Sequence, residues 1–215
     1  MLLKTDKKII KNFRLAIILG CFCTPVAFAE AIQCMPPSTS LKKVCSEEFN
    51  TQREKLDNLY LTASLVTDAP LRIIQDTQQI WQSRLQQCKS IDCYKQQFEL
   101  RADDLNIFVS LNQSLTQHYL KFEHGTFAQP FTQLKVHQLT KDRIKIEGLS
   151  YRNPNNRLET QTIPFLAYTT PDQKTDILDN EHDCKYQFNY SKAILSVQTK
   201  QKGCERFAGI YRLYD

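Results

Sequence analysis

The first half of the chain places hydrophobic residues at a helical period. Mostly apolar side chains recur three or four positions apart over residues 45–63, 71–88 and 94–108. This spacing puts them on one face of a helix with about 3.6 residues per turn. Pro70 suits the first turn of the second segment, and Ser90 suits the start of the third. The pattern predicts three helices, of which the first two run antiparallel because their linker is short.

In the second half the period changes to that of β-strands. Residues 144–147 alternate apolar and polar side chains, residues 153–156 (Asn-Pro-Asn-Asn) are a strong turn signal, and residues 158–168 resume a strand-like run. A second hairpin is predicted over residues 184–197, and a last strand over residues 207–214. Each of these segments is short, as strands in antiparallel sheets usually are.

The two patterns together predict an α+β fold class. We expect an N-terminal antiparallel helical bundle, stapled by disulfides, over residues 30–108, and a small antiparallel β domain over residues 136–215. Residues 109–135 fit either a linker or the tail of the third helix. Such small units have thin cores, so cross-links would matter to their stability.

The first 29 residues have the features of a secretory signal peptide. Five Lys or Arg residues precede an apolar run over residues 15–26, and Ala27-Phe28-Ala29 matches the cleavage pattern. The apolar run is shorter than the roughly 20 residues that span a bilayer. We therefore expect a periplasmic or secreted protein with no transmembrane segment in the mature chain. Residues 18–21 loosely match a lipobox, so a lipid anchor at Cys21 is the alternative.

Cleavage after Ala29 would leave six cysteines, an even number that can pair completely in an oxidising compartment. Antiparallel packing of the first two helices would place the ends of their apolar stripes together. This geometry favours Cys45–Cys88 and leaves Cys34 for Cys93, while Cys184 and Cys204 bracket the second predicted hairpin and are expected to form the third bond, Cys184–Cys204. The four N-terminal cysteines allow three connectivities, so the other two pairings stay open.

Charge and motifs narrow the classes of function. The signal segment carries five Lys or Arg residues and one Asp, so its removal lowers the formal net charge from +5 to +1. A nucleic-acid partner, which needs a basic surface, is not expected. The sequence contains no catalytic or phosphate-binding motif. Cys88 and Cys93 are too far apart for a Cys-x-x-Cys redox pair, and zinc would require further nearby ligands. We expect no enzyme, no cofactor and no metal.

The N-terminal cysteines and their neighbours resemble a known family. Their order is similar to that of LprI-type lysozyme-inhibitor N-terminal domains, and the resemblance, over about residues 34–106, rests on Cys34, Cys45, Gln78, Trp81, Arg84, Cys88, Cys93, Phe98, Arg101 and Leu105. Those domains are small, helical, disulfide-bearing modules of exported bacterial proteins. The resemblance implies a lysozyme-inhibitor-like protein that blocks a cell-wall hydrolase, such as a C-type lysozyme, by protein–protein contact. The C-terminal half weakly resembles the small β domains found with such modules.

The remaining candidate residues divide into structural positions and partner contacts. Trp81 lies within an apolar stripe and is expected in the core. Arg84 and Arg101 are expected to pack along the helices or pair with carboxylates such as Asp103 or Asp104. An acidic segment could meet a cationic partner and accelerate its association. These candidate contacts are Asp176, Asp179, Glu181 and Asp183. The alternative function is a periplasmic envelope scaffold or maintenance protein without lysozyme binding, which the near-neutral mature charge favours.

Overall fold

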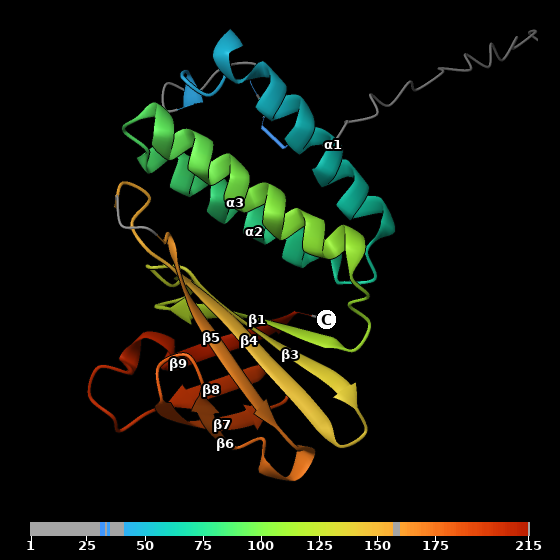
Figure 1. The fold of residues 1–215 in the computed structure, drawn as a ribbon, viewed down its shortest axis with the longest axis vertical. Helices are drawn as coiled ribbons and strands as arrows, with labels where there is room; N and C mark the ends of the chain where they lie inside the picture. The colour runs from blue at the N-terminus through green and yellow to red at the C-terminus, as the bar shows by residue number, and fades with distance from the viewer. Residues whose placement is uncertain (1–30, 33, 35–40, 157–159, 215) are drawn as a thin grey trace, which may run out of the picture.

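The computed structural model describes residues 31–32, 34, 41–156 and 160–214, so the predicted signal peptide lies outside the described residues. Three helices form a layer over one end of an antiparallel sheet (Figure 1). A 3₁₀ turn, η2, precedes them. Their bounds are η2 Glu47–Phe49, α1 Asn50–Val66, α2 Leu71–Gln87 and α3 Ile91–Ser110. The three predicted helices are confirmed, with ends shifted by a few residues.

Helix α3 packs against both other helices, whereas α1 and α2 contact each other little. Phe98, near the middle of α3, contacts side chains from both other helical segments. Its ring lies 5.8 Å from that of Phe49, just before α1, and 5.5 Å from that of Trp81 on α2, measured between ring centroids. A single α3 side chain therefore joins the other two helices into one hydrophobic cluster.

The structure pairs the N-terminal cysteines differently from the prediction. Cys34 is bonded to Cys45 and Cys88 to Cys93, with Cα separations of 5.7 and 5.5 Å. The predicted Cys45–Cys88 and Cys34–Cys93 bonds are therefore wrong. That prediction required α1 and α2 to be direct neighbours, but α3 takes up most of the contact with α1. The third bond, Cys184–Cys204, is as predicted, with a Cα separation of 5.8 Å.

Within the described residues the sheet has nine strands, all joined by antiparallel pairing. Their bounds are β1 Thr116–Glu123, β2 Thr126–Phe127, β3 Thr132–Thr140, β4 Arg143–Tyr151, β5 Thr162–Thr169, β6 Asp176–Asp179, β7 Cys184–Ser191, β8 Ile194–Gln198 and β9 Gly209–Tyr214. The order is β5-β4-β3-β1-β9-β8-β7-β6, with β2 paired to β1. The sheet is nearly closed, because β6 returns to β5, where the Asn180 N–H donates to the Leu166 oxygen at 2.7 Å.

Apart from residues 109–110, which end α3, the segment 109–135 is neither a linker nor a helix tail. It contains β1, β2 and the start of β3, and β1 lies in the middle of the sheet between β3 and β9. The sheet thus spans residues 116–214 and is larger than the predicted β domain. The sequence pattern hid β1 because four consecutive residues, His118 to Lys121, are buried. A strand buried on both faces lacks the alternation that marks a half-exposed one.

Two hydrophobic cores follow from the position of β1. Neighbouring residues on a strand point to opposite faces, so Leu120 joins the cluster under the helices and Tyr119 joins the cluster inside the curled sheet.

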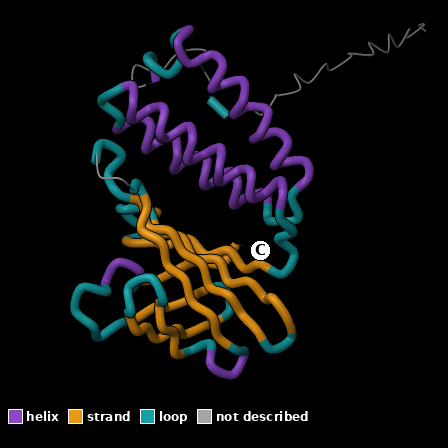
Figure 2. The backbone as a smooth tube through the Cα atoms, viewed as in Figure 1, coloured by secondary structure: helices purple, strands orange, loops and turns teal. Residues whose placement is uncertain are grey.

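The last strand also reaches the helices, since the Tyr214 hydroxyl donates to the Asp76 carboxylate at 2.6 Å. The tube view shows the β4–β5 connection rising from the sheet toward the turn between α2 and α3 (Figure 2).

Candidate functional site

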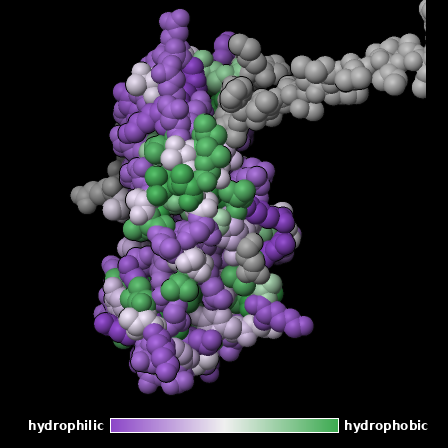
Figure 3. Space-filling model, turned by 90° about the vertical axis from the view of Figure 1, so that its right-hand side faces the viewer, coloured by the Kyte–Doolittle hydropathy of each residue, from purple (hydrophilic) through white to green (hydrophobic). Residues whose placement is uncertain are grey.

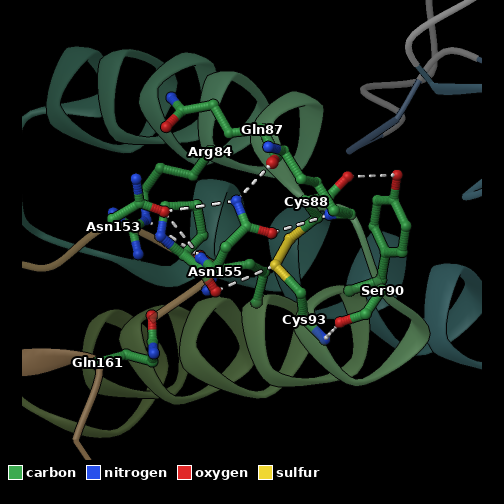
Figure 4. Close-up of a disulfide and its surroundings, with 12 residues drawn as sticks. Arg84, Gln87, Cys88, Ser90, Cys93, Asn153, Asn155 and Gln161 are labelled. Carbon is green, nitrogen blue, oxygen red and sulfur yellow. Dashed lines mark hydrogen bonds between the residues drawn. A yellow bond between two sulfur atoms is a disulfide. The ribbon is translucent and has the colours of Figure 1, made fainter. Parts of the chain in front are cut away.

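The β4–β5 connection docks on the turn between α2 and α3 through Asn155 (Figure 4). Its Nδ2 donates to the backbone oxygen of Gln87 at 2.7 Å, and its Oδ1 accepts from the backbone N–H of Lys89 at 2.9 Å. The last carbonyls of a helix lack partners within the helix. One asparagine therefore binds the backbone on both sides of Cys88, at the end of α2.

The loop around Asn155 is also ordered internally. The Asn153 Oδ1 accepts from the backbone N–H of Asn155 at 2.9 Å, and the Asn156 N–H donates to the Asn153 carbonyl at 2.9 Å. Such side-chain-to-backbone bonds stabilise tight turns. The Pro154 carbonyl oxygen lies 3.1 Å from Cys93 Sγ, a close contact rather than a hydrogen bond because a disulfide sulfur carries no hydrogen.

A polar hollow of about 480 Å³ opens beside this loop. Its helical wall is the first part of α3, where Asp92, Lys95 and Glu99 follow at positions i, i+3 and i+7 and so share one helix face. All three side chains are exposed. The lining residues are Ser90, Asp92, Cys93, Lys95, Gln96, Glu99, Pro154, Asn155 and Asn156. We call this the junction hollow. The disulfide and the hydrogen bonds of Asn155 fix the backbone around the hollow, which makes it a candidate surface for binding a partner.

Behind the loop, Arg84 connects the helices to the sheet. Its Nε donates to the Gln97 side-chain oxygen at 3.0 Å, and its Nη1 donates to the Arg152 carbonyl at 2.8 Å. The guanidinium carbon lies 4.7 Å from the centre of the Tyr151 ring, within the range of a cation–π interaction. Burial lowers the pKa of Arg84 to about 10, which leaves it charged at neutral pH. This arrangement agrees with the predicted structural role.

Arg101 is the second buried arginine of the helical layer. Its guanidinium donates to the Gln78 side-chain oxygen at 2.8 Å and to the Ile74 carbonyl at 3.1 Å, and it pairs with the Asp104 carboxylate. Burial lowers the pKa of Arg101, and the nearby Asp104 carboxylate opposes that shift. Trp81, also buried, donates from its indole Nε1 to the Gln97 carbonyl at 2.7 Å. These residues stabilise the helical layer.

The structure separates the four acidic candidates. Asp179 has no exposed surface, so its predicted role as a partner contact is wrong. Asp176, Glu181 and Asp183 are exposed and remain candidate contacts. Asp176 begins β6, whereas Glu181 and Asp183 follow its other end, so the three do not form a single cluster.

Sequence reasoning identified the turn at residues 153–156 but not its docking. Nothing local to the turn shows that Asn155 binds residues 87 and 89. The one available signal was the concentration of asparagines, whose side chains both donate and accept hydrogen bonds. Asp92 and Glu99 carried no signal beyond their spacing on α3.

The described part of the chain contains no group of three or more His, Cys, Asp or Glu side chains arranged to hold a metal ion. None of the helices there combines the length and the apolar character needed to cross a bilayer.

No family model matches the chain, and no curated protein or solved structure is significantly similar to it. The resemblance to LprI-type domains stays a prediction that rests on the residues given for it above.

Proposed function

We propose that this chain is an exported bacterial binding protein, similar in function to lysozyme inhibitors, that blocks a cell-wall hydrolase by protein–protein contact. The observation that carries the proposal is the double hydrogen bond of Asn155 to residues 87 and 89. It holds the β4–β5 loop against the Cys88–Cys93 disulfide before any partner arrives. A surface ordered in advance loses little conformational entropy on binding.

The charges at the junction hollow suit a basic partner such as a C-type lysozyme. Asp92 and Glu99 are two turns apart on α3, roughly 10 Å along the helix axis, and both are exposed beside the pinned loop. Complementary charges mainly accelerate association. Lys95, between them, offsets part of this negative charge.

The location in this proposal is the periplasm or the extracellular space. Three disulfides fit a protein that folds in an oxidising compartment. The predicted signal peptide supports export, and a lipid anchor at Cys21 is the alternative form of the same proposal.

The test is a titration of the oxidised protein, residues 30–215, against a C-type lysozyme acting on cell-wall substrate. We expect stoichiometric inhibition that is lost in a reduced and alkylated sample. The double variant Asp92→Asn/Glu99→Gln should weaken inhibition by about tenfold through slower association. The matched variant Asp176→Asn/Glu181→Gln removes two carboxylates elsewhere and should change inhibition less than about twofold if the junction hollow is the contact.

Two further results separate the parts of this proposal. If only the Asp176/Glu181 variant weakens inhibition, the function stands and the contact lies at β6. If the oxidised protein does not inhibit at micromolar concentration, the inhibitor function is wrong.

A specific surface feature favours the second candidate, an envelope scaffold that does not bind lysozyme. Exposed apolar side chains gather where the α1–α2 and α3–β1 connections meet, a corner that Figure 3 shows as a hydrophobic area. The Asp68 carboxylate joins these connections by accepting from the backbone N–H groups of Gln113 (2.7 Å) and Ser114 (3.1 Å). The exposed residues are Leu65, Val66, Leu71, Leu111 and Leu115. Contiguous exposed apolar surface often marks a lasting protein contact.

The scaffold candidate predicts that the variant Leu65→Asp/Leu115→Asp loses partners that the wild type cross-links in envelope preparations. Inhibition of lysozyme would be absent in both proteins. If the variant keeps every cross-linked partner, this corner does not carry a scaffold function.

A further inference from the structure

A second cavity lies outside the junction hollow, between α3 and the outer face of β3, β4 and β5. It has a volume of about 250 Å³. Ile107 of α3 forms one wall, and its apolar floor comes from Leu149, Pro164 and Leu166 on β4 and β5. Pockets of this kind, mostly apolar with a few converging polar groups, are the usual binding sites for small molecules. We call it the sheet groove.

On its β3 side the sheet groove contains two polar side chains that make no hydrogen bond or ion pair with the described residues. Lys135 and Gln133 are two positions apart on β3 and therefore point to the same face. Their exposed fractions are 7 % and 5 %. Within the described residues, the Lys135 ammonium has no ion pair or hydrogen bond and lies 5.5 Å from the centre of the Phe108 ring. The side-chain amide of Gln133 likewise makes no hydrogen bond with the described residues.

The carboxylate opposite Lys135 on the neighbouring strand makes no ion pair with it. Glu147 stands opposite Lys135 in the β3–β4 pairing, but it binds His137 Nε2 at 2.9 Å and also pairs with Lys145. The hydrogen bond from His137 is the main cause that lowers the pKa of Glu147, to about 2. On the other side of Lys135, burial lowers the pKa of His118 to about 3, so His118 carries no charge at neutral pH.

The ammonium of Lys135 and the side-chain amide of Gln133 therefore lie together on the β3 side of the groove, next to its apolar floor. Glu181 also lines the groove. It comes from the β6–β7 connection, so β4 and β5 lie between it and Lys135 on β3. An anionic group is favoured at the Lys135 end and an apolar group over the floor. The planar carboxylate group has two acceptor oxygens, one for the ammonium and one for the amide.

We propose that the sheet groove binds a small organic carboxylate, with its carboxylate at Lys135 and Gln133 and its apolar body over Leu149, Pro164 and Leu166. The site is separate from the junction hollow, and the proposal does not depend on lysozyme inhibition. It assigns a ligand class, an amphipathic carboxylic acid, to a surface that the proposed function does not use.

The probe is octanoate, titrated into the oxidised ¹⁵N-labelled protein, residues 30–215, and followed by amide chemical shifts. We expect saturable shifts confined to β3, β4, β5 and the C-terminal part of α3. Octan-1-ol, which has the same chain without the charge, should bind about tenfold more weakly. The variant Lys135→Met keeps the length of the side chain and should remove this preference for octanoate.

A matched control and a second variant keep the test decisive. Lys185→Met removes an exposed ammonium from β7, which does not line the sheet groove, and should leave octanoate binding unchanged. Gln133→Leu should weaken octanoate binding severalfold and leave octanol binding unchanged. The proposal is overturned if octanoate does not bind at millimolar concentration, if octanol binds equally well, or if a folded Lys135→Met protein keeps its preference for octanoate.

Discussion

The carboxylate of Asp179 accepts a hydrogen bond from the backbone N–H of Leu166, at 3.1 Å, where β5 and β6 meet. The same carboxylate accepts from the backbone N–H of Glu181 at 3.1 Å and lies 2.8 Å from Nδ1 of His182. A side chain thus takes the place of a backbone acceptor at the point where the sheet nearly closes. The acidic segment preceding Cys184 therefore contains a residue that holds the fold together.

Replacing Asp179 with alanine should destabilise the protein by about 3 kcal/mol, because two partly buried backbone N–H groups would lose a charged acceptor. Urea unfolding measures the change. The matched variant Asp176→Asn alters an exposed carboxylate on the same strand and should stay within about 0.5 kcal/mol of wild type. Equal stability of the Asp179→Ala and wild-type proteins would contradict the role given to Asp179.

Replacing Arg101 with methionine should destabilise the helical layer by about 3 kcal/mol. The substitution removes the partner of the Asp104 carboxylate, of which little is exposed, and of the buried Gln78 side-chain oxygen. Breaking a buried pair is costly. The control is Arg72→Met, since the Arg72 side chain is 64 % exposed and its pair with Asp76 is long, at 3.5 Å. Thermal unfolding followed by far-UV circular dichroism compares the two. A larger loss from Arg72→Met would refute this ranking.

The disulfides make a prediction that is independent of any partner. A peptide map of the non-reduced protein should contain Cys34–Cys45, Cys88–Cys93 and Cys184–Cys204. In the chain-entropy model, removing Cys184–Cys204 by a double alanine substitution should cost about 3 kcal/mol, and removing Cys88–Cys93 about 2 kcal/mol, because the first closes a longer loop. A peptide linking Cys45 to Cys88 would show the arrangement of the helices to be wrong.

His118 should make stability depend on pH. Burial lowers the pKa of His118 from 6.5 to about 3, so between these values the unfolded chain binds a proton that the folded chain does not. Stability must therefore fall as the pH falls from 6.5 toward 3. Between pH 6.5 and 4.5 the loss should reach about 2 kcal/mol, and over this range Glu147, with its pKa of about 2, stays ionised in the folded state.

The variant His118→Phe isolates this contribution. Phenylalanine keeps the ring that packs near Phe108, at 5.7 Å between ring centroids, and removes the titrating group. Urea unfolding at pH 6.5 and at pH 4.5 should show a smaller loss for the variant than for the wild type. If the two proteins lose the same stability, His118 is not the titrating group.

The helices and two of the hairpins could be predicted because their signals are local. A period of 3.6 residues identifies the exposed and buried sides of α2 and α3 without reference to any partner. The Asn-Pro-Asn-Asn turn between β4 and β5 follows from the backbone preferences of its own residues. Strand β1 gave no such signal, because both of its faces are covered, one by the helices and one by the curled sheet.

Some features of this protein follow from its local sequence, and others depend on how distant segments pack together. The amino-acid sequence alone determined where helices and turns form, that six cysteines follow the predicted signal peptide, and that Trp81 is buried. Only the tertiary structure decided that Cys88 pairs with Cys93, that Asp179 is buried, and that Lys135 lines a groove in which no described carboxylate pairs with it. Local periodicity shows which face of an element is apolar, but a partner in space is selected by the packing of the whole chain.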